Sequence, residues 1–338
     1  MSIAAGRYLT HLAYILPSVV AVAVYALRAT PISTNELPCP ADPGLGSRPT
    51  NSRARILYKE DWTEGGSYVT LPLGTVRYWL DGPESGRKVI LIHGLTTPSV
   101  AFERLVPMLV DAGCRVLAYD LYGRGYSDAP RAVAYDTNLY VTQLALLMQC
   151  VGWSRAHLVG FSMGGAIASA FVASFPHLVE DKIILIASAG AGRGEKPVPL
   201  AGYRHFSFVH SFIVRRFLKS LPPKESSSGF QMQLEFLPLQ VAELAGYKRA
   251  VASSLLEGPI TRMHWAWQSK NWVGKKALLI HGTRDAVVPP AASNLIRDIL
   301  QSHAKTQVQL VEVEGAGHDL TWTNTSEVGA AIVGFLRG

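Results

Sequence analysis

The chain has 338 residues and a formal net charge of +7, and 48% of its residues are hydrophobic. This length allows one large domain or two small ones with a substantial core. The basic excess is mild and includes no dense run of Lys or Arg, so the composition excludes a typical nucleic-acid-binding protein. The three cysteines provide neither a disulfide framework nor the spacing of a metal site; we expect Cys114 and Cys150 to be buried and Cys39 to be unpaired.

An almost charge-free apolar run, residues 9–27, lies between Arg7 and Arg28. About twenty residues is the length that crosses a bilayer as a helix, so residues 1–29 are predicted to be a transmembrane signal anchor. We therefore expect a single-pass membrane protein of the secretory pathway or endoplasmic reticulum, with its orientation left open by one arginine on each side. The alternatives are a buried soluble helix and a signal peptide cleaved after Val24-Tyr25-Ala26, which would give a secreted protein.

Residues 30–55 are rich in Pro, Gly, Ser and Asn, which is typical of a linker. The folded domain then begins with two short β-like runs, Ser67–Leu71 and Thr75–Asp81. These runs predict an antiparallel hairpin at the edge of a sheet.

From residue 88 onward, apolar runs that suit strands buried on both faces alternate with segments of helical spacing. The predicted strands are Lys88–Ile92, Arg115–Asp120, His157–Phe161, Lys182–Ala187, Lys276–Ile280 and Gln307–Val313. The predicted helices are Ser99–Ala112, Leu139–Cys150, Met163–Ser174, Ala291–Gln301 and Ser326–Leu336. This alternation predicts an α/β domain with a mostly parallel central sheet and flanking helices, made of residues 56–189 and 274–338.

The alternation stops between residues 190 and 273, where aromatic and basic residues predict several short helices inserted as a cap. Such an insertion lies over the carboxyl ends of the strands, where open α/β sheets bind ligands. Met263, Trp265 and Trp267 are expected either to line an acyl-binding pocket or to form the cap's own core. Residues 206–221 mix Phe with Arg and Lys, and either a plain cap helix or a helix resting on a membrane explains them.

The most informative motif is Gly160-Phe161-Ser162-Met163-Gly164, which follows an apolar run and precedes a helix-compatible segment. This is the pattern of a nucleophile elbow, in which a strained turn exposes the serine hydroxyl. A serine needs a base and an orienting third group to be nucleophilic at neutral pH. Asp285 and His318 each follow a predicted strand, so they are expected at the same edge of the sheet as Ser162.

The order Ser, Asp, His along the chain is the one that the α/β-hydrolase arrangement uses. The sequence resembles the α/β-hydrolase superfamily in five segments, namely 93–95 (HGL), 120–127 (DLYGRGYS), 160–164 (GFSMG), the Asp285 segment and the Gly317-His318 segment. The resemblance implies that Ser162 is the nucleophile, His318 the general base and then acid, and Asp285 the orienting carboxylate. It also implies an oxyanion hole made by the backbone N–H groups of Leu95 and Met163, with no cofactor or metal.

Other residues near these motifs allow competing interpretations. Asp181 is the alternative acid of the triad, whereas His93 and His281 are expected to be structural. The segment that begins at Asp120 is expected to shape a loop. The sequence Asn324-Thr325-Ser326 is a glycosylation sequon, but it also opens the last predicted helix, so helix capping explains it equally.

Taken together, these features predict a membrane-anchored serine hydrolase that cleaves a hydrophobic carboxylic ester, lipid or acylglycerol-like, through an acyl-enzyme. Its expected partners are the small hydrophobic substrate and the membrane, without nucleic acid and without an obligate protein partner. Within the same fold, hydrolysis of a thioester, a lactone or a carbon–carbon bond in a small metabolite is the alternative. The alternative from another functional class is a non-catalytic binding or receptor module built on a hydrolase scaffold.

Overall fold

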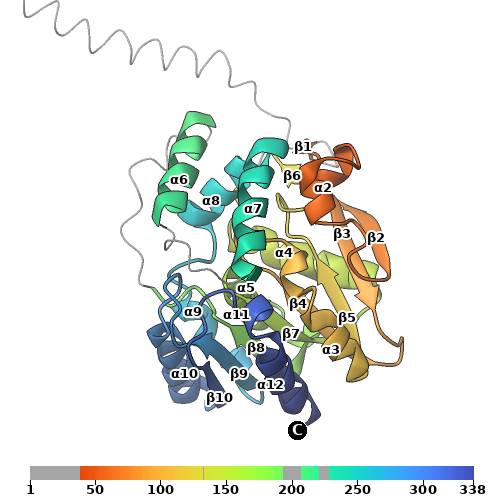
Figure 1. Ribbon diagram of the computed structural model, residues 1–338. Coiled ribbons are helices and arrows are strands. Elements are labelled where there is room, and N and C mark those ends of the chain that lie inside the picture. Colours follow the sequence, from red (N-terminus) through yellow and green to blue (C-terminus); the bar gives the residue numbers. More distant parts are fainter. Residues whose placement is uncertain (1–38, 132, 193–206, 221–227) are drawn as a thin grey trace, which may run out of the picture.

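A mostly parallel, eight-stranded sheet forms the centre of the molecule and has helices on both faces (Figure 1). The computed structural model describes residues 39–131, 133–192, 207–220 and 228–338. The prediction of an α/β-hydrolase sheet is confirmed. The predicted anchor, residues 1–29, lies outside the described residues. Within the part that the structure describes, no helix is both long and apolar enough to cross a membrane.

The strands of this sheet follow the order β2-β3-β5-β4-β7-β8-β9-β10. They are β2 (Gly66–Leu71), β3 (Gly74–Asp81), β4 (Arg87–Ile92), β5 (Cys114–Tyr119), β7 (Ala156–Phe161), β8 (Val179–Ile186), β9 (Lys276–Gly282) and β10 (Gln307–Val313). The pairs β2–β3 and β3–β5 are antiparallel, and all other pairs are parallel. The predicted hairpin is therefore confirmed as β2–β3 at one edge.

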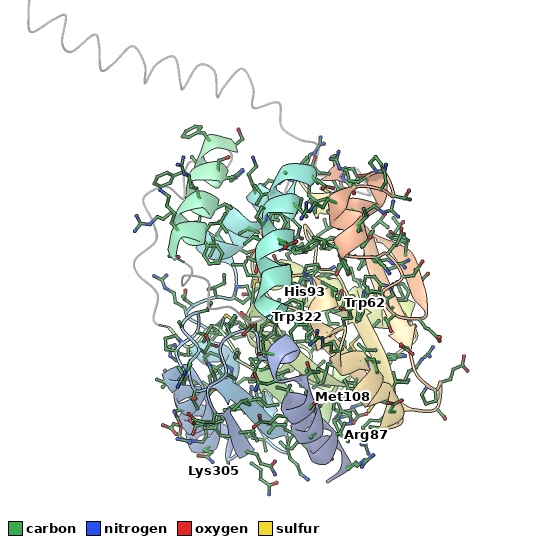
Figure 2. The ribbon with its side chains drawn as sticks, viewed as in Figure 1. Trp62, Arg87, His93, Met108, Lys305 and Trp322 are labelled. Carbon is green, nitrogen blue, oxygen red and sulfur yellow. The ribbon has the colours of Figure 1, made fainter. Side chains whose placement is uncertain are left out.

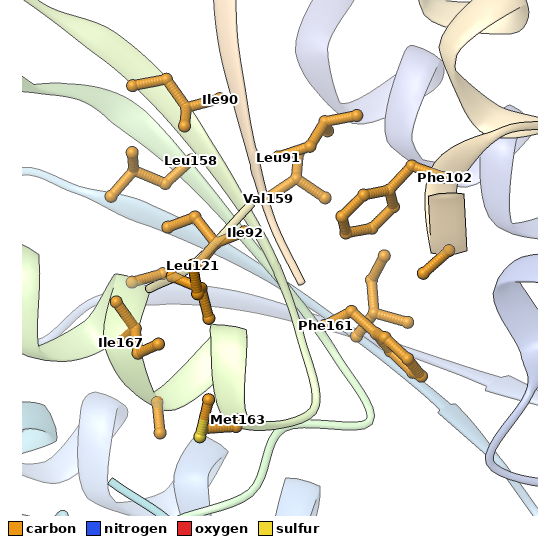
Figure 3. Close-up of a cluster of buried hydrophobic side chains, with 14 of the residues drawn as sticks. Ile90, Leu91, Ile92, Phe102, Leu121, Leu158, Val159, Phe161, Met163 and Ile167 are labelled. Atoms are coloured by element: carbon orange, nitrogen blue, oxygen red, sulfur yellow. The ribbon is translucent and has the colours of Figure 1, made fainter. Parts of the chain in front are cut away.

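The central strands form because their apolar side chains are buried on both faces of the sheet. Successive residues of a strand point to opposite faces. Figure 3 shows Ile90 and Leu158 on one side of the sheet and Leu91 and Val159 on the other. All four are fully buried. This two-sided burial is the reason that the runs lack polar alternation.

Helices cover the sheet on both sides. Helices α3 and α12 lie on one face, and α4, α5 and α10 lie on the other (Figure 1). Their bounds are α3 (Leu105–Asp111), α4 (Thr137–Cys150), α5 (Met163–Ser174), α10 (Ala291–Ala304) and α12 (Thr325–Arg337), and two short helical turns are η3 (Pro176–Leu178) and α11 (Leu320–Thr323). The single helix predicted over residues 99–112 is divided into η2 (Ser99–Phe102) and α3.

A group of helices between β8 and β9 covers the end of the sheet at which the parallel strands finish (Figure 1). The helices over this end are α6 (Ser207–Ser220), α7 (Ser228–Glu243) and α8 (Tyr247–Glu257), whereas α9 (His264–Trp267) and η5 (Lys270–Trp272) pack on α5 and α10. They fall within the insertion predicted at residues 190–273. Helix α6 packs on α8, and α7 packs on α8 and α11.

The prediction of a linker as far as residue 55 is wrong over its second half. That half contains β1 (Ala41–Asp42), which pairs with β6 (Ala129–Pro130), and also η1 (Leu45–Ser47) and the start of α2 (Arg53–Leu57). Leu45 and Ala54 are fully buried, and the Ala54 N–H donates to the Glu243 carboxylate of α7 at 3.3 Å. The composition correctly indicates mostly irregular backbone, but this backbone is hydrogen-bonded to the core and the cap and is not a free linker.

One of the three cysteines, Cys150, is placed differently from the predictions. Cys114 is buried, as expected, but Cys150 is exposed because it ends α4 on the side that faces solvent. Cys39 is buried, and its thiol donates weakly to the Pro40 carbonyl. All three are free thiols.

Candidate active site

Ser162 lies in the sharp turn between β7 and α5, with φ 55° and ψ −120°. A positive φ is uncommon for a residue other than glycine and marks a strained turn. The turn is held by its own backbone, since the Ser162 N–H donates to the Ile186 carbonyl at 2.9 Å and the Ser162 carbonyl accepts from the Ala189 N–H at 3.0 Å. These two hydrogen bonds hold the strained turn in place and so fix the Ser162 hydroxyl at the carboxyl end of the sheet.

The glycines on both sides of the serine are required by the close approach of strand and helix. A Cβ at Gly160 would overlap the Gly164 carbonyl, and a Cβ at Gly164 would overlap the Ile92 carbonyl of β4. Backbone, which cannot move aside as a flexible side chain does, occupies both positions. The elbow can form at this place only because these residues have no side chain.

The structure brings the three predicted triad residues together. The His318 Nε2 lies 3.0 Å from the Ser162 Oγ, and the His318 Nδ1 lies 2.7 Å from the Asp285 Oδ2. The Phe161 ring lies against the imidazole with ring centroids 5.2 Å apart. A nucleophile within hydrogen-bond reach of a base, which is itself oriented by a carboxylate, is the geometry of nucleophilic acyl transfer.

Asp285 is buried and accepts several hydrogen bonds that keep it ionised. Its Oδ1 accepts from the backbone N–H groups of Val287 at 2.9 Å and Val288 at 2.8 Å. Burial on its own would raise the pKa of this carboxyl, but hydrogen bonds from His281 and His318 outweigh burial and hold the pKa well below its usual range. The carboxylate is therefore charged at neutral pH and can stabilise an imidazolium at His318.

The predicted oxyanion-hole residue Leu95 follows a fixed peptide unit. The buried ring of His93 (Figure 2) accepts at Nε2 from the Leu121 N–H at 2.9 Å, so its proton is on Nδ1, which donates to the Gly94 carbonyl at 2.8 Å. In a trans peptide the C=O and N–H point in opposite directions, so the Leu95 N–H points away from His93. A Cβ added at Gly94 would lie 3.6 Å from the Ser162 Oγ, which shows how near this strand end is to the nucleophile.

The second predicted donor, the N–H of Met163, belongs to the first residue of α5. The first N–H groups of a helix have no acceptor within it, and they carry the positive end of the helix dipole. Met163 directly follows the nucleophile in the turn. Both residues lie next to the Ser162 elbow, and their role as the oxyanion hole stays a prediction.

An apolar cavity of about 160 Å³ opens beside the triad. Its apolar lining consists of Leu95, Phe161, Met163, Ala189, Phe217, Leu237, Leu255, Ile260, Val287 and Val288, and Ser162 and His318 also border it. The cap contributes Phe217 from α6, Leu237 from α7 and Leu255 from α8. Sequence reasoning missed these three as lining residues, because nothing in a helical sequence shows which face will lie over a distant strand end.

The expected acyl pocket at Met263, Trp265 and Trp267 is corrected by the structure, because none of the three borders this cavity. Trp267 is fully buried, and its indole N–H donates to the Ser169 hydroxyl of α5 at 2.9 Å. Met263 is also buried, whereas Trp265 is 48% exposed. Met263 and Trp267 therefore belong to the packing between α9 and the core.

The competing acid, Asp181, is not near the triad. Its carboxylate lies 3.9 Å from the His157 Nδ1. His281, expected to be purely structural, lies close to the triad carboxylate: its Nε2 is 3.3 Å from the Asp285 Oδ2. Asn324 precedes α12, but its side chain makes no capping hydrogen bond, so the capping explanation of the sequon is wrong.

Asp120 is fully buried beneath the loop that it begins, as the loop-shaping interpretation expects. It accepts from the Tyr58 hydroxyl at 2.9 Å, from the Ser99 N–H at 3.0 Å and from the Tyr126 N–H at 2.8 Å. Burial raises its pKa to about 6, although the hydrogen bonds from Ser99 and Tyr126 oppose the rise. The carboxylate joins the segments around residues 58, 99 and 126.

Residues 83–324 match the family model described as serine aminopeptidase, S33. The chain belongs to this family. It is a serine hydrolase of the α/β-hydrolase fold.

Similar proteins support the assignment over most of the chain. The S33 chain is 24% identical over 299 residues to a mouse (Mus musculus) serine hydrolase-like protein, covering 80% of this chain and 94% of that one. Its fold is similar to an esterase from Exiguobacterium antarcticum (TM-score 0.63, 20% identity, 81% of this chain and all of that one). It is also similar to a structure described as a membrane phospholipase A and bacterial virulence factor (TM-score 0.65, 21% identity, 98% of both chains).

The names of similar proteins cover several chemistries. Besides esterases, they include a bromoperoxidase and meta-cleavage product hydrolases. At sequence identities of 20–22%, likeness to these structures establishes only the fold of the chain. The substrate of this S33 hydrolase has to be argued from its own cavity.

Proposed function

We propose that this serine hydrolase cleaves a carboxylic ester with a hydrophobic acyl group, lipid or acylglycerol-like. The observation that carries the proposal is the apolar lining of the cavity at the Ser162 hydroxyl. A cavity of about 160 Å³ is smaller than the roughly 300–1,000 Å³ of sites for drug-sized ligands. It therefore suits the acyl chain of a substrate better than a whole polar metabolite.

The family description suggests an aminopeptidase, but the described lining argues against one. A peptide substrate with a free N-terminus presents a cationic ammonium group near the scissile bond. Burying this cation beside apolar side chains is costly unless a carboxylate pairs with it. Among the described residues that border the cavity, none is Asp or Glu. An uncharged acyl group meets no such cost, so the lining favours an ester.

In the proposed mechanism the Ser162 Oγ attacks the acyl carbonyl as its proton moves to the His318 Nε2. The oxyanion accepts from the N–H groups of Leu95 and Met163, and ionised Asp285 stabilises the imidazolium. Collapse breaks the bond to the leaving alkoxide, which takes the proton from His318 and departs as the alcohol. Water then gives its proton to His318 and attacks the acyl-enzyme, and the acid leaves as the proton returns to Ser162.

The names of two similar structures, an esterase and a membrane phospholipase A, are consistent with this substrate class. These names describe the activities of those two proteins, and they agree with the substrate class proposed for this chain. A thioester or lactone would react with the same triad.

The test uses the full chain in detergent micelles with a fluorescent fluorophosphonate, which labels an activated serine. Ser162→Ala is expected to abolish labelling and to lower ester turnover by at least about 10³-fold. Ser302→Ala, which changes an exposed serine on α10, is the control and should match the wild type. Folded protein that is labelled equally with and without Ser162 would contradict the catalytic role and favour a binding module.

Substrate class is read from a second measurement on the same protein. We expect 4-nitrophenyl esters of four to twelve acyl carbons to be cleaved with kcat/KM at least about tenfold above that for leucine 4-nitroanilide, an aminopeptidase substrate. Faster turnover of the anilide than of every ester would overturn the ester proposal while leaving the serine hydrolase assignment intact.

A further inference from the structure

Helix α6 presents an unusual outer surface for a cap helix. Phe208 is 67% exposed and Phe212 is 56% exposed. These residues are four positions apart, so they lie on the same side of the helix. One to two turns further along, Arg215, Arg216 and Lys219 are also exposed. We call these five residues the α6 outer face.

The charge of the α6 outer face is uniformly positive. Helix α6 contains no Asp or Glu. Among the described residues, none of its two arginines and one lysine forms an ion pair within 4.0 Å. Two exposed aromatic rings beside three cations is the composition of a helix that lies in a bilayer interface, where rings enter the acyl boundary and cations contact phosphates.

The opposite side of α6 is already used by the fold. Val209 and Val214 are buried, α6 packs on α8, and Phe217 borders the active-site cavity. The apolar surface that α6 gives to the core therefore comes from residues on its inner side. Because one helix carries both surfaces, a membrane at the outer face would lie one helix diameter, about 10 Å, from the cavity wall.

The chain enters the described domain at the same end of the molecule. Strand β1 lies beside the cap helices, at the end of the molecule that also carries α6 (Figure 1). Residue 39, just before β1, is separated from Arg28 by ten residues, which reach at most about 40 Å. If the apolar run 9–27 crosses a bilayer, as its sequence predicts, this tether keeps the cap end rather than the opposite end against the membrane.

We propose that the α6 outer face docks onto a bilayer that carries anionic lipids. The two phenylalanines enter the interface, and the three cations contact phosphates and acidic headgroups, to which the negative surface potential attracts them. Docking puts the cap beside the lipid phase, from which a hydrophobic ester reaches the cavity. The delivery of an ester to the cavity rests on the proposed function, whereas the contact between the α6 outer face and the membrane does not.

The contact is tested by fluorescence quenching on the full chain reconstituted in vesicles, in a Ser162→Ala background so that lipid hydrolysis does not interfere. Phe212→Trp places an indole on the α6 outer face. Leu295→Trp is the matched control, because Leu295 is also an exposed helical residue (40%) but lies on α10, at the far end of the molecule (Figure 1). Brominated phospholipids quench an indole that enters the acyl boundary.

We expect bromolipid to quench the added indole of Phe212→Trp at least about threefold more strongly than that of Leu295→Trp in vesicles with 30 mol% phosphatidylserine. We also expect the difference to shrink in pure phosphatidylcholine or at 1 M salt, which screens the cations. Equal quenching of the two variants would overturn the docking proposal, even if the enzyme proves to be an ester hydrolase. Equal quenching in both lipids would overturn the choice of an anionic surface.

An activity measurement links the surface to the substrate. Phe208→Ser/Phe212→Ser is expected to lose about tenfold in turnover of a long-chain ester embedded in anionic vesicles, while hydrolysis of a water-soluble short ester stays within about twofold. Equal loss on both esters contradicts a surface role. A dimer in light scattering that the double variant abolishes would assign the α6 outer face to a second copy of the chain and also overturn the proposal.

Discussion

The Nδ1–H of His93 donates to the carbonyl of its own neighbour, Gly94, at 2.8 Å. Burial lowers the pKa of His93 to about 3, so the ring is neutral at physiological pH. Because the same peptide unit supplies the Leu95 N–H, the histidine sets the direction of a donor that we expect to bind the oxyanion. His93 does not itself border the cavity, so we expect it to act on the reaction only through this donor.

Two amide substitutions separate the two hydrogen bonds of His93. His93→Asn puts an N–H near the former Nδ1 and keeps the bond to Gly94, whereas His93→Gln puts an amide near the former Nε2 and loses that bond. We expect His93→Gln to lower kcat by about 10–100-fold with little change in KM, because one oxyanion donor is typically worth about 10²–10³ in kcat. His93→Asn should stay within about fivefold of the wild type.

Turnover of a 4-nitrophenyl ester measures both variants, and urea unfolding checks that their stabilities are similar. If the two variants lose the same activity at equal stability, the bond to Gly94 does not orient the donor.

His281 supports the triad from the other side of Asp285. Its Nε2 donates to the Val288 carbonyl at 2.9 Å and lies 3.3 Å from the Asp285 Oδ2, while its Nδ1 lies 2.6 Å from the Ser293 hydroxyl. We expect His281→Ala to lower kcat/KM about tenfold or more, because a carboxylate that shifts misplaces His318. His281→Gln, which keeps an N–H near Nε2, should recover most of the loss.

Steady-state kinetics of the two His281 variants checks this role, with circular dichroism as the control for folding. A glutamine variant that is as slow as the alanine variant, although equally folded, would show that His281 only fills space.

The triad could be predicted from the sequence because each member follows a strand within a short, recognisable motif. Sequence reasoning failed where position depends on tertiary packing. Trp265 and Trp267 are two positions apart on one short helix and so face different ways: one is half exposed and the other is bonded to Ser169. The cap's share of the cavity wall instead comes from three helices whose orientation over the sheet no local pattern encodes.

The segment 39–57 illustrates the same limit. Its Pro, Gly and Ser content correctly indicates the absence of long helices and strands. Composition does not show that Leu45 is buried or that its N–H donates to the Gly125 carbonyl at 2.9 Å, because both depend on residues far along the chain. Local composition predicted the type of backbone but not its partners.

The elbow glycines give a prediction with an internal control. Gly164→Ala adds a Cβ that overlaps the Ile92 carbonyl, and backbone must move to relieve the overlap. Gly334→Ala makes the same change in the exposed part of α12, where a Cβ meets nothing within 4 Å. We expect Gly164→Ala to lower the free energy of unfolding by about 3 kcal/mol or more and to abolish turnover. Gly334→Ala should raise the free energy of unfolding by about 0.5–1 kcal/mol.

Urea unfolding and ester turnover test the pair. A Gly164→Ala protein that is as stable and as active as Gly334→Ala would contradict the close approach of α5 to β4.

The last prediction concerns the pH dependence of stability and follows from Asp120. Its carboxyl has a pKa of about 6 in the folded protein, raised by burial, and near 4 when the chain is unfolded. Between these values the folded state binds the proton and the unfolded state does not. The stabilisation from protonated Asp120 is therefore fully present below about pH 4 and is lost as pH rises through 6.

Asp120→Asn removes this titration while keeping a side chain of similar shape. We expect the free energy of unfolding of the wild type, minus that of the variant, to fall by about 2–3 kcal/mol between pH 4 and pH 7, at about 1.4 kcal/mol per unit of pKa difference. Asp285 acts in the opposite sense, because its lowered pKa gives stability that is lost as the solution becomes acidic. It is present in both proteins, so its effect cancels in the difference. Urea titrations at half-unit pH intervals measure the two curves, and parallel curves would show that Asp120 stays ionised inside the fold.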